Sequence, residues 1–386
     1  MDYLIENGDI YTPYSIIENG KVLIKGHKIA KILKKEESLT AAEEIAAHVI
    51  DAQGGVVIPG FIDLHIHGGA GADTTDETPE SIDKIVKFHL DNGTTGMLLS
   101  TMSGSPFADL KRQLGVIQSS MDIHESVIGI HLEGPYLNPL YCGMYPPATL
   151  RKPDIDEFKE LIDLSYNNIR MLTIAPELEG AFDLIRYCSQ NAIVASMGHS
   201  EADYETIRKA ITFGLSHVTH VCNAMKPLHH RQPGALGASL MDNRLSVQVI
   251  CDGIHLHPLI VKMIMRLKGS RNVCLITDAM RAAGMPEGDY MLGKFENVHF
   301  QNGFVTSDDG ALASTALTML QSFRNILAFG DISFSQAINT VSTTPAHVLG
   351  LGNYIGSIDV GYDADILILD RDLNIQHTLL KGTPVT

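Results

Sequence analysis

Between residue 59 and about residue 350, apolar runs with β-strand character alternate with stretches in which apolar residues recur at helical spacing. Eight of the runs have the length and composition of buried strands. They span 61–67, 95–100, 127–133, 169–175, 192–198, 216–220, 247–252 and 273–278. The helical stretches between them span 79–91, 106–121, 155–164, 181–190, 201–213 and 257–267.

This alternation predicts an α/β fold with a parallel sheet. Eight strand–helix units favour a (β/α)8 barrel of the TIM type, which typically needs about 250 residues. A doubly wound sheet is the alternative, and it would usually carry a Gly-rich phosphate-binding turn after its first strand. The first run here ends in His65-Ile66-His67-Gly68-Gly69 instead.

At both ends of the chain the pattern differs and consists of short β-type runs separated by turns. Runs at 3–5, 21–24 and 29–33 precede a brief predicted helix at 40–48, and further runs follow at 364–369 and 378–380. Because chain termini often lie close together, we expect the two ends to form one small β-sandwich domain. The predicted division is therefore 1–55 and 353–386 for the small domain and 56–352 for the barrel.

Composition narrows the class of partner. The chain has 386 residues, which suits one large domain with or without a small one. Its formal net charge is −16, which argues against nucleic acid or an anionic membrane surface as the main partner. A small anionic ligand needs only a local cationic pocket and remains compatible with this charge.

The remaining composition indicates the compartment. The 5 cysteines contain no C-x-x-C pair, as is typical of reduced thiols in a cytoplasmic protein. The start of the chain lacks a basic segment followed by an apolar one, and no apolar run reaches the ~18–20 residues of a membrane span. We therefore expect a soluble cytoplasmic protein.

The predicted strands end in polar residues with metal-binding chemistry. The active site of a (β/α)8 barrel lies where its strands end, and side chains two apart on a strand face the same way. A single strand-end histidine is more often structural, but imidazoles and carboxylates converging from five strands favour zinc or another divalent transition metal. These strand-end residues are His65, His67, His131, Glu133, His199, His220 and Asp278.

A metal at these positions implies hydrolytic chemistry. A divalent ion lowers the pKa of a coordinated water towards ~7 and polarises a carbonyl oxygen. Asp278 is the best candidate to take the proton from that water and return it to a leaving nitrogen. Asp63 either orients a ligand imidazole from behind or caps a strand, and His131 is predicted to lie behind the ligands.

Two loops near the predicted mouth gather cationic residues. Lys226 and Arg231 lie in the loop 226–234, and His255 lies in the loop 252–257. A solvated loop is the ordinary interpretation of one basic run. Two such loops on neighbouring strands of an acidic chain favour a site for an anionic group such as phosphate.

The segment 59–68, Pro-Gly-Phe-Ile-Asp-Leu-His-Ile-His-Gly, resembles the opening motif of the amidohydrolase superfamily. The segments 131–139, 198–200, 219–225 and 277–279 resemble more specifically the deacetylases that act on N-acetylglucosamine 6-phosphate. The resemblance extends nearly from end to end. It implies hydrolysis of the N-acetyl group to give glucosamine 6-phosphate and acetate.

The resemblance also implies roles for individual residues. Glu133, His199 and His220 would hold the principal ion, with Asp278 as general base and acid. His65 and His67 vary among relatives, so one or two ions of zinc, iron, manganese or cobalt are compatible with the motif. The substrate-binding positions implied in this way are Cys142, Gly143, Asn223, Ala224, Arg231 and His255.

Relatives of this kind are typically homodimers, in which a cation such as Arg231 can serve the neighbouring subunit's site. One departure concerns the loop after Pro135, where Met144 and Tyr145 replace a small residue and a histidine. That change leaves open another N-acyl amino-sugar phosphate as substrate. A cyclic amide is a second enzymatic alternative. A non-catalytic relative is disfavoured, because the ligands and the predicted base are all present.

Overall fold

The computed structural model describes residues 1–386 apart from 41–42, 44–46, 105 and 386. Its central element is a parallel eight-stranded sheet with the strand order β15-β14-β13-β12-β11-β10-β9-β6. In chain order the strands are β6 (Phe61–Ile66), β9 (Thr94–Ser100), β10 (Val127–Glu133), β11 (Ile169–Ile174), β12 (Val194–Met197), β13 (Leu215–Val218), β14 (Ser246–Ile250) and β15 (Val273–Ile276).

The sheet closes into a barrel where β15 returns to β6. At this seam the Asp278 amide donates to the His65 carbonyl at 2.9 Å, and the His67 amide donates to the Ala279 carbonyl at 2.9 Å. The strands are almost wholly buried, as expected for a parallel sheet covered on both faces. The predicted (β/α)8 barrel is therefore confirmed, and a doubly wound open sheet is excluded.

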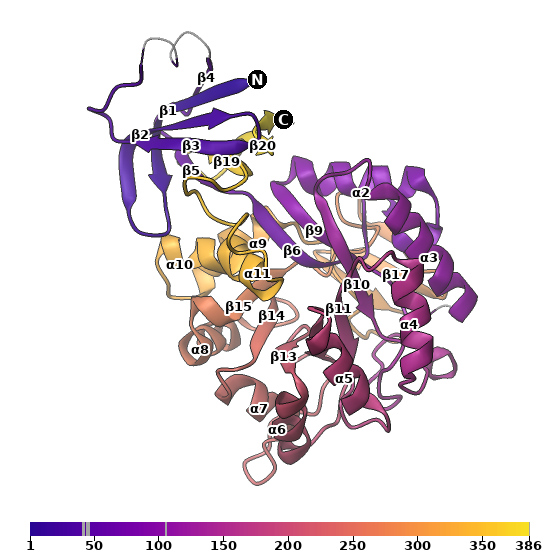
Figure 1. Cartoon of the computed structure of the whole chain (residues 1–386). Coiled ribbons are helices and arrows are strands. Elements are labelled where there is room, and N and C mark those ends of the chain that lie inside the picture. Colours follow the sequence, from indigo (N-terminus) through magenta and orange to yellow (C-terminus); the bar gives the residue numbers. More distant parts are fainter. Residues whose placement is uncertain (41–42, 44–46, 105, 386) are drawn as a thin grey trace.

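Helices surround the barrel (Figure 1). Six of them match predicted stretches within three residues at either end. Phe158, Leu161 and Ile162 of α4 are buried against the core, and the side chain of Asp154 caps its first turn. The six are α2 (Pro79–Asp91), α3 (Phe107–Ser120), α4 (Ile155–Leu164), α5 (Ala181–Gln190), α6 (Tyr204–Phe213) and α8 (Pro258–Lys268).

Several elements were not predicted. Helix α7 (Gly234–Met241) is rich in glycine and alanine and buried on most sides, so its sequence has little periodicity. A three-stranded antiparallel sheet follows the barrel's last strand. Further unpredicted elements include β16 (Gly288–Leu292), β17 (Glu296–Gln301), β18 (Phe304–Ser307), α9 (Met319–Phe329), α10 (Phe334–Ile338) and α11 (Thr344–Val348).

The two chain ends meet in a small mixed β-domain (Figure 1), as the sequence predicts. Strand β19 runs antiparallel to β5, with Leu367 opposite Ile58. The small sheet thus includes β5 and extends past residue 55. Its strands are β1 (Asp2–Tyr11), β2 (Ile16–Lys25), β3 (Lys28–Leu33), β4 (Ala47–Asp51), β5 (Val56–Pro59), β19 (Ile366–Leu369), β20 (Ile375–Leu380) and β21 (Thr383–Pro384).

Neighbouring residues of this sheet pack on opposite faces. Ile5 and Val22 belong to one apolar cluster, whereas Leu4 and Leu23 belong to another. Most of the helix predicted at 40–48 lies outside the described residues, and Ala47 and His48 belong to β4 rather than to a helix.

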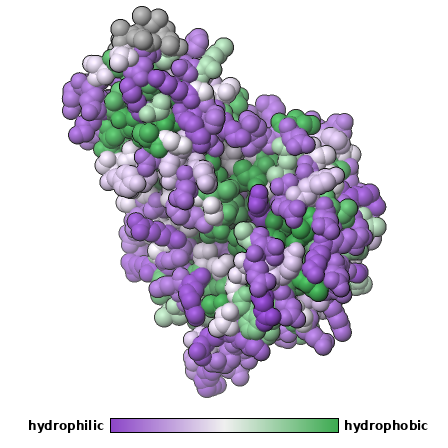
Figure 2. Space-filling view, in the orientation of Figure 1, coloured by the Kyte–Doolittle hydropathy of each residue, from purple (hydrophilic) through white to green (hydrophobic). Residues whose placement is uncertain are grey.

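The molecular surface is largely polar over the outer helices. In Figure 2 hydrophilic residues cover the helical exterior, and hydrophobic residues show mainly between them and on the small domain. Within the described residues, no helix combines the length and hydrophobicity needed to cross a bilayer.

Candidate metal centre and active site

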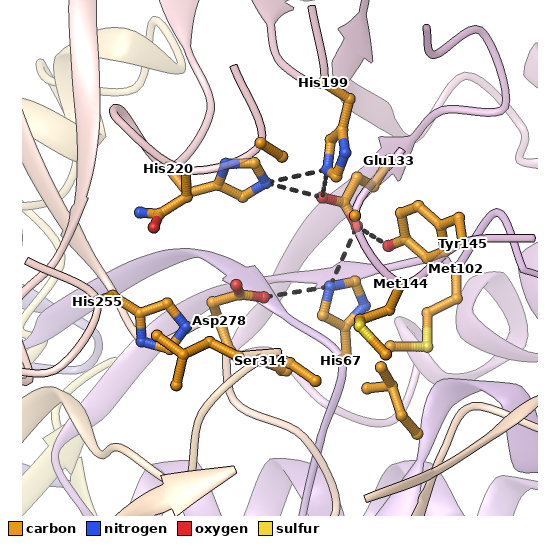
Figure 3. A pocket seen from close by; sticks show the side chains of 16 residues that line it. His67, Met102, Glu133, Met144, Tyr145, His199, His220, His255, Asp278 and Ser314 are labelled. Carbon is orange, nitrogen blue, oxygen red and sulfur yellow. Dashed lines mark hydrogen bonds and ion pairs between the residues drawn. The ribbon is translucent and has the colours of Figure 1, made fainter. Parts of the chain in front are cut away.

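A cavity of about 200 Å³ opens at the carboxyl ends of the barrel strands (Figure 3). It brings together most of the residues that the sequence predicts as metal ligands. Its lining residues are His67, Met102, Glu133, Gly143, Met144, Tyr145, His199, His220, Asn223, Ala224, His255, Asp278, Leu292, Leu312, Ala313 and Ser314.

One set of candidate ligands lies at the barrel seam, and we call His65, His67 and Asp278 the seam group. The Nε2 atoms of His65 and His67 lie 3.0 Å apart. Each lies 3.4 Å from Asp278 Oδ1. All three residues are at least nine-tenths buried, and His67 and Asp278 also line the cavity.

A second set comes from β10 and the ends of β12 and β13, and we call Glu133, His199 and His220 the loop group. Glu133 Oε1 lies 3.3 Å from His220 Nε2 and 3.4 Å from His199 Nε2. Those two nitrogens are 3.1 Å apart. The other oxygen, Glu133 Oε2, lies 3.3 Å from His67 Nε2, so this carboxylate stands between the two groups.

The charges at the centre suit a cation. Burial raises the pKa of Glu133, but the imidazoles of His65, His199 and His220 outweigh it and hold that pKa well below its ordinary value. Burial lowers the pKa of His67, but the carboxylates of Asp278 and Glu133 raise it overall to about 10. Two buried carboxylates thus stay ionised beside the imidazoles, and this pocket favours positive charge.

Hydrogen bonds at the nitrogens that face away from the cavity fix the orientation of two histidine rings. His65 Nδ1 lies 3.2 Å from the Gln248 side-chain oxygen, and His199 Nδ1 lies 2.8 Å from the Tyr141 carbonyl. Because each Nδ1 donates its proton to an oxygen, the Nε2 of the neutral ring turns a lone pair into the cavity. Inward lone pairs together with carboxylates are the donor set of a divalent transition metal, so these residues fit such an ion.

The two residues predicted to lie behind the ligands have different contacts. The Asp63 carboxylate accepts from the Thr277 hydroxyl at 2.6 Å and from the His65 backbone N–H at 3.1 Å, and these two bonds tie the seam together. Burial raises the pKa of Asp63 to about 7. His131 lies edge-on to the His65 ring and bonds to Thr173 at 2.7 Å.

Four of the predicted substrate-binding residues line the cavity, namely Gly143, Asn223, Ala224 and His255. Cys142 does not line it, and its thiol lies 3.2 Å from the Pro139 carbonyl. Arg231 is exposed and pairs with His230 at 2.7 Å, outside the cavity lining of its own chain.

The apolar wall of the cavity was not predicted from the sequence. Leu292, Leu312 and Ala313 lie in or beside the unpredicted three-stranded sheet, so no strand end marked them. Gln248 was also missed, although one polar residue between Val247 and Val249 was an available signal. Its oxygen also accepts the His220 amide at 3.3 Å.

Contacts between loops support His199. Glu177, which follows β11, accepts from the Asn138 side chain at 2.8 Å and from the Ser200 hydroxyl at 2.7 Å. The backbone N–H of Asn138 donates to the His199 carbonyl at 3.0 Å. The loop after β10 is thereby fixed to the end of β12.

Three of the candidate ligands have left-handed backbone conformations. The φ angles are 49° at His199, 26° at His220 and 51° at Asp278. Residues other than glycine adopt positive φ uncommonly, and such strain concentrates at functional sites. Each of these residues lies two positions after the end of its strand, where the left-handed turn aims the side chain into the barrel mouth.

Comparison with known proteins gives a consistent result. A model of the amidohydrolase family matches residues 56–385. The chain is 35% identical to the N-acetylglucosamine-6-phosphate deacetylase of Bacillus subtilis, over 98% of this chain and 96% of that protein. It is 34% identical to the N-acetylgalactosamine-6-phosphate deacetylase of Escherichia coli O157:H7, over 89% of this chain and 91% of that protein.

A solved structure gives the same picture. A mutant N-acetyl-D-glucosamine-6-phosphate deacetylase from Mycobacterium smegmatis, in complex with N-acetyl-D-glucosamine-6-phosphate, superposes with a TM-score of 0.92 at 31% identity. The superposition covers 100% of this chain and 99% of the other.

Proposed function

Because the chain belongs to the amidohydrolase family, we infer that it hydrolyses the N-acetyl group of N-acetylglucosamine 6-phosphate. The products are glucosamine 6-phosphate and acetate. The observation that carries this inference is the cavity at which the two ligand groups, with Asp278 in one of them, meet at the strand ends of a barrel. The end-to-end similarity to deacetylases of this sugar phosphate supports the choice of substrate.

We propose that the loop group holds the principal ion and that the seam group is the position for a second. When bound, a divalent ion lowers the pKa of a water and polarises the amide carbonyl. Zinc, iron, manganese and cobalt all suit this set of nitrogen and oxygen donors.

Asp278 is the residue that we propose to move protons. It takes one from the attacking water and returns one to the amide nitrogen as the C–N bond breaks. Its carboxylate faces the cavity, and the hydroxyl of Ser314 donates to its backbone carbonyl. The end of β15 is thereby held in place beside the ligands.

We propose that the sugar phosphate binds at the side of the cavity that carries Asn223, Ala224 and His255. In Figure 3, His255 lies across the cavity from Met102 and Met144, so the site has a polar side and an apolar side. His255 is oriented by Asp252, whose Oδ2 lies 2.7 Å from its Nδ1. Its Nε2 is the nitrogen left for a ligand, and it donates to an anion when the ring carries a proton on both nitrogens.

We further propose a homodimer in the cytoplasm. Arg231 is exposed and lies outside the cavity of its own chain, which is consistent with a role in the neighbouring subunit's site. A sugar phosphate needs a compensating cation, and this loop is a source of one.

Acetate release from N-acetylglucosamine 6-phosphate by the metal-loaded enzyme tests the activity. Unphosphorylated N-acetylglucosamine should react much more slowly, because it lacks the anion that His255 and Arg231 are proposed to bind. N-acetylgalactosamine 6-phosphate is the matched comparison, since one relative bears that activity in its name. No acetate from the first substrate, or faster release from either of the others, would contradict the assignment.

A further inference from the structure

Tyr145 is buried in the wall of the cavity, with a fractional exposure of 7%. Its ring centroid lies 6.0 Å from that of Phe295 and 5.6 Å from that of His199. Its hydroxyl donates a hydrogen bond to Glu133 Oε2 (Figure 3). The residue thus has an apolar body that packs and one polar atom with a specific partner.

The two oxygens of Glu133 have different neighbours. Oε1 faces the two imidazoles of the loop group and, at 3.5 Å, His65 Nε2. Oε2 faces the Tyr145 hydroxyl and His67. The last torsion of a glutamate side chain is broad and roughly two-fold, so packing alone fixes the carboxylate plane poorly. A directional partner on Oε2 is therefore needed to keep Oε1 aimed at His199 and His220.

Tyr145 is the residue that can supply this direction when an ion is bound. Among the described residues, every other side-chain neighbour recorded for the Glu133 carboxylate is a histidine Nε2. A nitrogen that ligates a metal uses its lone pair and has no proton to donate. Once the imidazoles of both groups bind ions, the Tyr145 hydroxyl is the one donor left on this carboxylate among those contacts.

We propose that Tyr145 is a positioning residue, whose hydroxyl orients Glu133 as a ligand of the loop-group ion. This inference rests on the proposed metal site but not on the identity of the sugar. Hydrogen bonds to ligating groups from the surrounding shell typically contribute 10–100-fold to metal affinity. The loop after β10 is then part of the metal centre as well as a wall of the substrate cavity.

The test is Tyr145→Phe, which removes the hydroxyl and keeps the ring. Zinc affinity is measured by competition with a chromophoric chelator, and the visible spectrum of the cobalt-loaded protein is recorded. We expect an affinity loss of about 10–100-fold and a shifted cobalt spectrum, because the geometry of Glu133 changes. Neither measurement depends on sugar turnover, so the outcome is separate from that of the deacetylation assay.

Tyr136→Phe is the matched control. Tyr136 is fully buried and donates to Glu157 at 3.1 Å, so this change also deletes a tyrosine–glutamate hydrogen bond, but outside the cavity lining. It should leave zinc affinity and the cobalt spectrum unchanged. Phe295→Leu, which loosens the packing of the Tyr145 ring but keeps the hydroxyl, should also leave both unchanged.

If Tyr145→Phe does not fold, Tyr145→Met fills the space with a flexible side chain without a donor, and the same loss is expected. Wild-type affinity and an unshifted cobalt spectrum in a folded Tyr145 variant would overturn the proposal. An equal affinity loss in Phe295→Leu would overturn it as well, because packing would then explain the effect.

Discussion

The seam group and the loop group offer similar donor atoms, but the structure holds them in different ways. The seam group is supported from within the barrel, where Gln248 contacts the His65 ring and Asp63 joins Thr277. The loop group is supported mainly by the loop after β10, through the Tyr141 carbonyl and the Tyr145 hydroxyl. From within the barrel, Gln248 also contacts the backbone N–H of His220. The seam-group ligands therefore depend on residues of the barrel strands, whereas the loop-group ligands depend largely on the loop after β10.

The largest expected effect is on chemistry and leaves the loop group intact. Asp278→Asn keeps the size of the side chain but removes the base, so kcat should fall about 10²–10⁴-fold. Acetate release measures the rate, and metal analysis should still find the loop-group ion. A rate within tenfold of wild type would mean that another group moves the proton.

The next prediction compares one ligand from each group. His199→Asn should lower affinity for the principal ion on the order of 10²-fold or more, because losing a ligand exceeds the cost of losing an outer contact. His65→Asn should retain one tightly bound ion. Both are measured by equilibrium dialysis against zinc. Tighter binding in the His199 variant would reverse our assignment of the principal site.

A third pair of variants tests separately the residues that support the two groups. Glu177→Gln weakens the anchoring of the loop after β10 and should raise its rate of proteolytic cleavage. Gln248→Leu should leave that rate unchanged and lower metal affinity about 10-fold. Limited proteolysis and zinc titration of both variants provide the comparison. Equal cleavage rates would show that the loop does not depend on Glu177.

The smallest expected effect concerns a histidine outside both groups. His217 lies on β13, the strand that precedes His220. It is fully buried, and its Nδ1 lies 2.6 Å from the Ser246 hydroxyl. Burial lowers its pKa to about 3, with Lys268 as a further cause. Because its pKa in the unfolded chain is near 6.5, unfolding takes up a proton below that pH, and stability falls as the pH falls.

His217→Asn should therefore reduce the loss of unfolding free energy between pH 7 and pH 5.5 by about 1 kcal/mol. Urea unfolding of the metal-free proteins at the two pH values measures it. His347→Asn, at an exposed position, should leave the loss unchanged. The same pH dependence in the His217 variant and the wild type would show that this ring is protonated in the folded state.

Sequence reasoning succeeded where periodicity and position carry the information. The barrel strands are apolar runs of predictable length, and His65, Glu133, His199 and Asp278 end or follow such runs, so their convergence could be predicted. The helix α7 lacked periodicity, and the wall formed by Leu292 and Leu312 lies beside strands that alternate weakly.

Other features have no signal in the sequence at all. The left-handed turns at His199 and Asp278 occur at residues other than glycine, so they could not be predicted from residue type. The sequence marked Tyr145 as unusual for the family, but only the packing of its ring showed that the hydroxyl meets Glu133. The exposed position of Arg231 likewise depends on loop geometry.

The barrel seam has a consequence for the growing polypeptide. Asp63 and Thr277, which hydrogen-bond across the seam, are 214 residues apart in the chain. A ribosome therefore delivers the paired histidines early, and Asp278, the proposed proton-transferring residue, only with the last barrel strand. Nascent or truncated chains that end before that strand have no complete site, so deacetylation reports that the barrel has closed.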